Sequence, residues 1–122
     1  MMELTKKEIG NWGEKIAVDY LKENGHKILD RNHSCRYGEI DIISRNKNDL
    51  YFIEIKTRRG THYGPAIESL SPQKLNKIRK TATYLLNQKK DWSLLIPHLS
   101  VLAIDEDPEG ELNIEFLPDA FE

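Results

Sequence analysis

The sequence predicts one α/β domain, a mixed sheet flanked by helices in the order helix, three strands, helix, two strands. Two segments, 6–24 and the one that starts at Ser71, carry apolar residues at helical spacing. Three short apolar runs lie between them and two follow, each bounded by turn residues. A length of 122 residues suits a single domain, 1–122, with a core of its own.

The first helix has a recognisable start and end. Thr5 and Glu8 match a capping box, and Gly25 suits the C-terminal stop. Gly13 lies within the apolar stripe, where glycine lowers helix stability, so we expect close packing at this point. The stripe consists of Ile9, Trp12, Ile16, Tyr20 and Leu21.

Shorter patterns predict the remaining elements. A first strand is expected around Ile28 and Leu29, and a hairpin is expected from "EIDIISR" and "LYFIEIKT", joined by the turn "NKND". Ser71 as N-cap and Pro72 after it begin the second helix. "HLSVLAI" and "ELNIEFL" are the last two strands.

Composition indicates a folded, soluble protein, because 39% of residues are hydrophobic and a disordered chain would have fewer. No apolar run approaches the roughly 20 residues of a membrane span, and the start "MMELTKKE" lacks the apolar stretch of a signal peptide. Cys35 is the only cysteine, which excludes a disulfide framework and a CxxC zinc site. We therefore expect a cytoplasmic setting and no membrane partner.

Charge is divided unevenly along the chain. All 18 Lys and Arg precede residue 105, together with only 12 of the 20 acids. The segment 105–122 holds the other eight acids and is expected to form an acidic hairpin and tail. A basic body is compatible with a polyanionic partner such as DNA, although charge alone favours a solvated surface with an acidic hairpin.

The hairpin carries carboxylates inside two apolar strands. A turn centred on 47–48 pairs residues whose numbers add up to 95. In this register Asp41 faces Glu54, and the next pair along is Glu39 and Lys56. Both faces of these strands carry apolar residues, so the acids would be partly buried, and opposed carboxylates repel each other.

A divalent cation would relieve this repulsion. Mg²⁺ is commonly held by one or two carboxylates with waters and a phosphate oxygen, and Mn²⁺ can take its place, so Asp41 and Glu54 are candidate metal ligands. Lys56 would reach the same space, where it could position or deprotonate an attacking water or stabilise charge on a phosphoryl group. Together these groups are the components of phosphodiester hydrolysis.

Other interpretations of the same residues stay open. A turn one residue longer would shift the register and place Asp41 opposite an isoleucine. Acids in an edge hairpin can also act against aggregation, and Lys56 can simply neutralise Glu39 or Glu54. Spacing alone does not decide between a metal site and a set of salt bridges.

The pattern of "GE" in the first helix, then "GEID" and "EIKTR", resembles that of a known family. The stretches "NWGEKIAVDYLKENGHKILDRN", "GEIDIISRNKNDLYFIEIKTR" and "YGPAIESLSPQKLNKIRKTATYLL" are similar to the YraN family, also called UPF0102. These small predicted nucleases belong to the restriction-endonuclease-like PD-(D/E)xK superfamily. The resemblance implies a restriction-endonuclease-like core and Mg²⁺- or Mn²⁺-dependent cleavage of DNA, on branched or single-stranded substrates.

The resemblance also implies roles for particular residues. Asp41 and Glu54 match the metal ligands, and Lys56 matches the catalytic lysine. Glu14 in the first helix matches a further acid that many superfamily members aim at the metal. The remaining candidates are Glu39 and Gln73 beside the site, and Arg58, Arg59, Lys74 and Lys77 on the nucleic acid.

The sequence departs from the family pattern at two places. Ile40 stands where the superfamily name has proline, and His98-Leu99-Ser100 stand where the family tends to have Arg-Phe-Asp. The alternative function is a nucleic-acid-binding module of nuclease fold that no longer cuts and acts with a partner protein or as a homodimer. A structural or interaction protein is the third hypothesis, and the acidic tail is its only sign.

Overall fold

The elements follow one another in the order that the sequence predicts, in a computed structural model that describes residues 5–59 and 71–120. The elements are α1 (Lys6–Glu23), β1 (Lys27–Cys35), β2 (Gly38–Asn46), β3 (Asp49–Arg59), α2 (Pro72–Gln88), the short 3₁₀ helix η2 (Lys90–Trp92), β4 (Ile96–Glu106) and β5 (Leu112–Leu117). No helix within the described ranges is long and apolar enough to cross a membrane.

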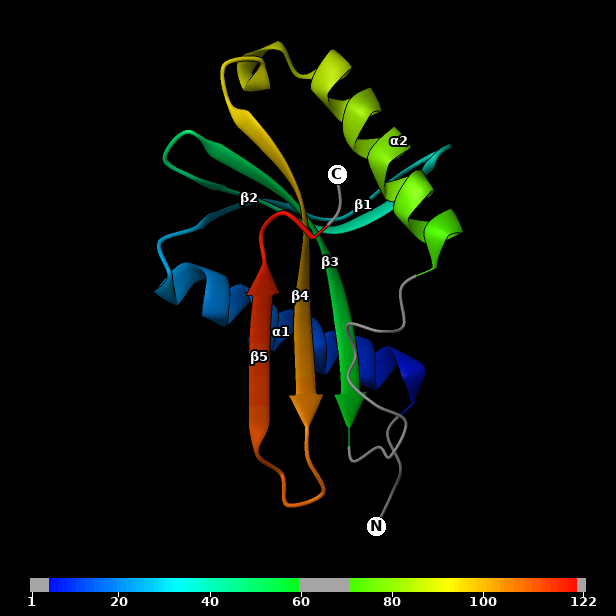
Figure 1. Cartoon of the computed structure of the whole chain (residues 1–122), viewed down its shortest axis with the longest axis vertical. Coiled ribbons are helices and arrows are strands. Elements are labelled where there is room, and N and C mark those ends of the chain that lie inside the picture. Colours follow the sequence, from blue (N-terminus) through cyan, green and yellow to red (C-terminus); the bar gives the residue numbers. More distant parts are fainter. Residues whose placement is uncertain (1–4, 60–70, 121–122) are drawn as a thin grey trace.

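The five strands form one mixed sheet in the order β1-β2-β3-β4-β5. β3 and β4 are parallel, and the other neighbouring strands are antiparallel. The chain passes through α2 between the two parallel strands, whereas α1 runs behind β3, β4 and β5 in Figure 1. This arrangement is consistent with a restriction-endonuclease-like core, as predicted.

The sheet buries apolar residues on both faces, and each face has its own helix. On the α1 side the buried cluster is Ala17, Val18, Leu21, Ile42, Ile53, Leu102 and Ile104. On the α2 side it is Ile40, Ile43, Leu50, Phe52, Ile78, Ala82, Leu85 and Leu95. The alternation of Phe52 and Ile53 between the two clusters confirms the prediction that β3 is covered on both faces.

Both helices begin at the caps that the sequence predicts. The Thr5 hydroxyl accepts the Glu8 N–H at 3.1 Å, and the Glu8 carboxylate accepts the Thr5 N–H at 3.2 Å. The Ser71 hydroxyl accepts the Lys74 N–H at 3.2 Å at the start of α2. These bonds fix where each helix starts, and therefore which side chains of its first turns face the sheet.

β1, β3 and β4 are longer than predicted, and β3 runs from Asp49 to Arg59. β1 extends to Cys35 through a polar stretch, and it contains an irregularity between Ile28 and Asp30. As an edge strand it bonds through its backbone to β2 alone among the described strands, so polar side chains do not prevent pairing. β4 starts at Ile96 and ends at Glu106, because its ladder with β3 continues through both ends.

His98-Leu99-Ser100 contribute to the fold. The His98 ring lies between two carboxylates, with Nε2 2.8 Å from Asp49 Oδ1 and Nδ1 2.6 Å from Asp119 Oδ1, and it stacks on Tyr51. Burial lowers the pKa of His98, but the hydrogen bonds to the two carboxylates outweigh burial and raise it. Ser100 donates to the Pro118 carbonyl at 2.6 Å. These residues fasten the segment after β5 to the sheet.

Gly13 allows α1 to approach β3 closely. A Cβ atom at this position would lie 2.4 Å from Cγ2 of Thr57, far inside van der Waals contact. We expect Gly13→Ala to lower the free energy of unfolding by about 1–3 kcal/mol, because overpacking outweighs the gain in helix propensity. Gly10→Ala is the matched control, since a Cβ there meets no atom of the described residues within 4 Å. Urea unfolding should show that Gly10→Ala stabilises the protein by about 1 kcal/mol. Equal effects of the two substitutions would show that close packing on Thr57 is not the reason for glycine at position 13.

Candidate active site

The predicted register of the β2–β3 hairpin is confirmed. Its paired residues run from Asn46 and Asp49 to Ile42 and Ile53, and each pair adds up to 95. β3 then continues from Ile55 to Arg59 along β4 alone among the strands described, while β2 turns away from it (Figure 1). A fork opens in the sheet at this point.

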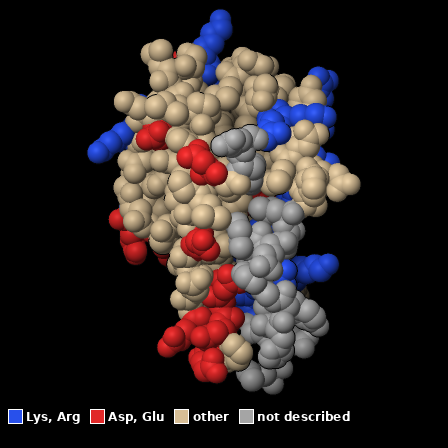
Figure 2. All heavy atoms as spheres, viewed as in Figure 1, with Lys and Arg blue, Asp and Glu red and all other residues tan. Residues whose placement is uncertain are grey.

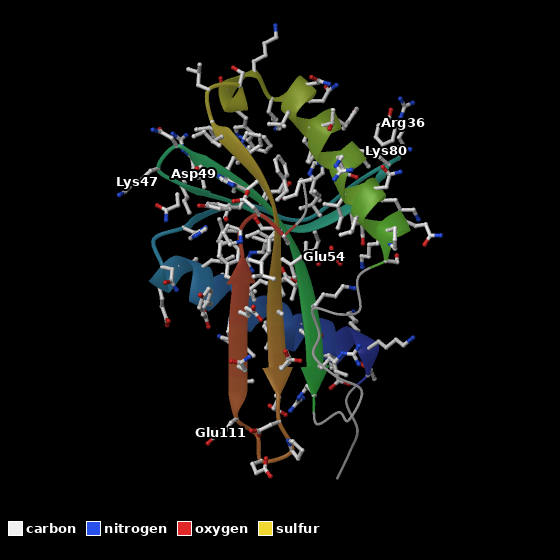
Figure 3. All side chains as sticks on the ribbon, viewed as in Figure 1. Arg36, Lys47, Asp49, Glu54, Lys80 and Glu111 are labelled. Carbon is white, nitrogen blue, oxygen red and sulfur yellow. The ribbon has the colours of Figure 1, made fainter. Side chains whose placement is uncertain are left out.

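Asp41 and Glu54 are the first residues beyond the last pair, one on each arm of the fork. The Asp41 Oδ2 atom accepts the Ile55 N–H at 2.9 Å. Glu54 is only 5% exposed and lies midway along β3 (Figure 3). Burial and the charge of Glu54 raise the pKa of Asp41 to about 7. The predicted repulsion between the two acids is therefore present.

Two lysines supply positive charge to the carboxylate pair. Lys74, from the first turn of α2, places its Nζ 2.6 Å from Oε1 of Glu54, and Lys56 Nζ lies 3.9 Å from the same oxygen. Burial and the nearby Lys74 lower the pKa of Lys56. Burial also lowers the pKa of Lys74, but the hydrogen bond and the charge of Glu54 raise it overall. Lys74 is thus the direct counter-ion of Glu54.

The fork opens into a cavity of about 580 Å³. It lies between the first half of α1, the start of α2 and strands β1 to β3. Its lining residues are Lys7, Gly10, Asn11, Glu14, Asn32, Asp41, Glu54, Ile55, Lys56, Thr57, Arg58 and Lys74. The volume is in the range of small-molecule and cofactor sites, and the lining carries both acids and bases.

Glu14 lines this cavity but does not join the carboxylate pair. Both of its oxygens accept hydrogen bonds from the Asn32 side chain, at 3.1 and 3.3 Å. Within residues 5–59 and 71–120, no three His, Cys, Asp or Glu side chains lie close enough together to hold a metal ion. The acids at the fork are therefore a pair, and Glu14 faces the same space from its bond to Asn32.

A family model described as "Uncharacterised protein family UPF0102" matches residues 13–104, most of the chain. The chain belongs to the UPF0102 family. The matched region contains the fork, Glu14 and Lys74, and ends before the acidic C-terminal segment. The resemblance seen in "GEID" and "EIKTR" is thereby confirmed.

Relatives in the UPF0102 family match over long stretches. A UPF0102 protein of Clostridium botulinum, strain Loch Maree, is 49% identical over 88 residues, 72% of each chain. A UPF0102 protein of Dictyoglomus turgidum is 40% identical over 120 residues, 97% of this chain and all of the relative. One of Syntrophomonas wolfei is 36% identical over 110 residues, 88% and 93% of the two chains.

The basic candidates of this UPF0102 protein divide into two groups. Arg58 and Lys74 line the cavity, whereas Arg59 and Lys77 do not. The Nε atom of Arg58 is buried and has no hydrogen-bond partner among the residues described. Arg59 donates to Glu106 at 3.1 Å and covers the ring of Trp12 at 4.6 Å. Arg58 is thus oriented toward the site, and Arg59 supports the packing of α1 on the sheet.

Glu39 and Gln73 lie outside the cavity of the UPF0102 protein. Glu39 is exposed and pairs with Ser34 of β1, and Lys56 contacts Glu54 in its place. Gln73 is exposed on the first turn of α2, next to Lys74, which enters the site. Gln73 and Lys74 are adjacent on α2, and only Lys74 faces the fork.

Sequence reasoning missed several cavity residues. Asn32 lies in the polar half of β1, which had no strand pattern, and Lys7 and Asn11 lie on the polar side of α1. The sequence places Lys74 among the bases expected on the nucleic acid, and no pattern in it indicates the contact with Glu54. Only the way that α1 and α2 pack on the sheet brings these residues to the fork.

Proposed function

We propose that this UPF0102 protein is a Mg²⁺- or Mn²⁺-dependent nuclease that hydrolyses phosphodiester bonds in DNA. The observation that supports it is the pair of half-buried Asp41 and buried Glu54 at the fork, with Lys56 beside Glu54 on the wall of an open cavity. Two acids and one lysine in this arrangement correspond to the components of metal-assisted phosphodiester hydrolysis. A polyanionic substrate accounts for the further bases on the cavity wall.

The residues at the fork fit a divalent cation. The donor set is made of carboxylate oxygens on adjacent strands, and the cavity leaves room for waters and a phosphate oxygen. Burial raises the pKa of Asp41 most, and the negative charge of Glu54 raises it further, while Lys74 lowers it. A bound cation would add positive charge, polarise a phosphoryl oxygen and make its bound water more acidic.

The protein's own groups have distinct tasks in this proposal. Asp41 and Glu54 hold the cation, with Asp41 kept in place by the Ile55 N–H. Lys56, whose pKa is lowered, can accept a proton from the attacking water more readily than an exposed lysine can. Arg58 and Lys74, the arginine and one of the lysines on the cavity wall, bind phosphate oxygens.

A cleavage assay tests the proposal. Purified protein is incubated with fluorescent single-stranded, flapped, branched and duplex DNA in MgCl₂, in MnCl₂ or in EDTA. We expect cleavage of at least one substrate with either metal and none in EDTA. Glu54→Gln, purified in the same way, controls for contaminating nucleases. It replaces one proposed carboxylate ligand by a neutral amide, so its cleavage should be lost. Intact DNA under every metal condition would overturn the proposal.

A second candidate function is a module of the same fold that binds nucleic acid without cutting it. The contact that favours it is the 2.6 Å pair of Lys74 and Glu54, because an ammonium group already neutralises one of the two carboxylates. This candidate gives salt-sensitive DNA binding with no turnover under either metal. The same substrates, measured for binding in the cleavage buffers, separate the two functions.

A further inference from the structure

We propose that the exposed face of α2, together with a groove lined by Tyr37 and Tyr84, binds single-stranded DNA, with a base stacked on the tyrosines. This inference rests on the proposed function in one respect, because the DNA bound here would be the substrate that is cut at the fork. The groove itself lies outside the acidic cavity and shares no lining residue with it.

The charge of α2 is unusual for a solvated helix. Its 17 residues contain four bases and no acid, whereas the 18 residues of α1 contain four of each. Exposed helices commonly place acids four residues from bases, and α1 does so with Lys15 and Asp19. Lys77, Arg79 and Lys80 form no salt bridge with any acid in the described part of the chain. This face therefore carries uncompensated positive charge, and basic side chains gather over α2 in Figure 2.

The groove is bounded by aromatic rings on two different elements. Tyr37 lies in the turn between β1 and β2, and its ring centroid is 5.5 Å from that of Tyr84 on α2, at 56°. The groove has a volume of about 450 Å³, and its lining residues are Tyr37, Arg79, Lys80, Thr83, Tyr84 and Asn87. No acid lines it.

Arg36 adds a guanidinium group to the same place. It donates to the Tyr37 hydroxyl at 2.6 Å, and its Cζ lies 4.8 Å from the centre of that ring. In Figure 3 Arg36 and Lys80 are on the same side of the molecule as α2. Tyrosine rings with arginine and lysine around them match the two requirements of single-strand binding, a stacking surface for bases and cations for the backbone.

The occupant is single-stranded because a duplex keeps its base faces covered. A base can stack on Tyr37 or Tyr84 only if it has left its own stack, as in a flap, a branch or a free strand. Lys74 and Tyr84 are ten residues apart on α2, which spans about 15 Å at 1.5 Å per residue. Lys77 lies between them on the same helix. A few nucleotides along α2 would thus connect the groove to the cavity at the fork.

The test measures binding in EDTA, without metal, so that it does not depend on cleavage. Fluorescein-labelled oligothymidylate of 20 nucleotides and a duplex of equal length are titrated by anisotropy. We expect the single strand to bind more tightly, Tyr84→Leu and Tyr37→Ala to weaken its binding about tenfold, and Tyr84→Phe to stay within about twofold. Lys80→Gln should reduce the slope of log K against log salt, as loss of one phosphate contact predicts.

Matched variants keep the result interpretable. Lys47→Gln removes a lysine from the hairpin turn, on the opposite side from Lys80 in Figure 3, and should leave binding unchanged. Thermal melting establishes that each variant is folded, and Tyr84→Leu keeps an apolar side chain against the core. Tight duplex binding, or unchanged single-strand binding in both tyrosine variants, overturns this inference. A protein that binds as expected but never cuts overturns only the proposed nuclease function.

Discussion

Asp41→Asn is expected to make the protein more stable at pH 8 and, in the same variant, to abolish metal-dependent cleavage. The Asp41 carboxylate is half-buried beside Glu54, and its loss of hydration and the charge of Glu54 raise its pKa to about 7. Asparagine is nearly the same size, its side-chain oxygen can still accept the Ile55 N–H, and its amide can donate to Glu54. The variant therefore keeps the local hydrogen bonds and loses the repulsion.

The sign and the pH range follow from proton linkage. Above about pH 4 the unfolded chain has lost the Asp41 proton, whereas the folded chain keeps it until about pH 7. Wild-type stability attributable to this group therefore falls as pH rises through that range. The advantage of Asp41→Asn should be near zero at pH 4 and about 2–4 kcal/mol above pH 7.

Urea unfolding at pH 4.5, 6 and 8 measures this difference, and the cleavage assay measures the activity. We expect a loss of at least about 10³-fold in rate, because the cation loses one of its two carboxylates. Glu39→Gln is the control: Glu39 is exposed on the same strand and lies outside the cavity. Glu39→Gln should change neither the free energy of unfolding nor the cleavage rate. A variant less stable than wild type at pH 8 would show that Asp41 is adequately paired.

The register of the β2–β3 hairpin was predictable from the sequence because its determinants are local, whereas the separation of the two strands beyond Ile42 and Ile53 was not. The turn at 47–48 sets the register, and the register alone places Asp41 and Glu54 on opposite arms. Lys47 at the turn has a positive φ of 56°, which a two-residue hairpin turn requires. Alternation then assigns Phe52 and Ile53 to opposite faces. None of these steps needs information about distant parts of the chain.

The residues that the sequence could not predict are placed by helix packing. Whether Gln73 or Lys74 faces the fork depends on how α2 is rotated against the sheet, and one residue corresponds to about 100° of rotation. Likewise, Glu14 was predicted beside the metal, and its bond to Asn32 depends on where β1 passes α1. Tertiary packing therefore decides where the side chains of Lys74 and Glu14 lie, and the spacing of residues within one helix does not reveal this packing.

Because Lys74 pairs with Glu54, we expect removal of this lysine to strengthen the binding of a divalent cation, whereas removal of a carboxylate ligand would weaken it. A divalent cation at the fork would need the Glu54 oxygen that Lys74 contacts at 2.6 Å, and it would be repelled by the ammonium charge. Lys74→Met removes this competitor and keeps the length of the side chain. We expect Mn²⁺ to bind this variant about tenfold more tightly than wild type, equivalent to about 1.4 kcal/mol.

Isothermal titration with MnCl₂, without DNA, measures the affinity. Lys77→Met is the matched control, since Lys77 is exposed one turn further along α2 and does not line the cavity. It should bind Mn²⁺ as wild type does, and Glu54→Gln should bind it at least about tenfold more weakly. Tighter Mn²⁺ binding with slower cleavage would show that Lys74 competes with the cation in the free protein and contacts phosphate when substrate is bound. Unchanged or weaker Mn²⁺ binding in Lys74→Met would mean that the lysine does not occupy the cation's place, and that its pair with Glu54 serves the fold.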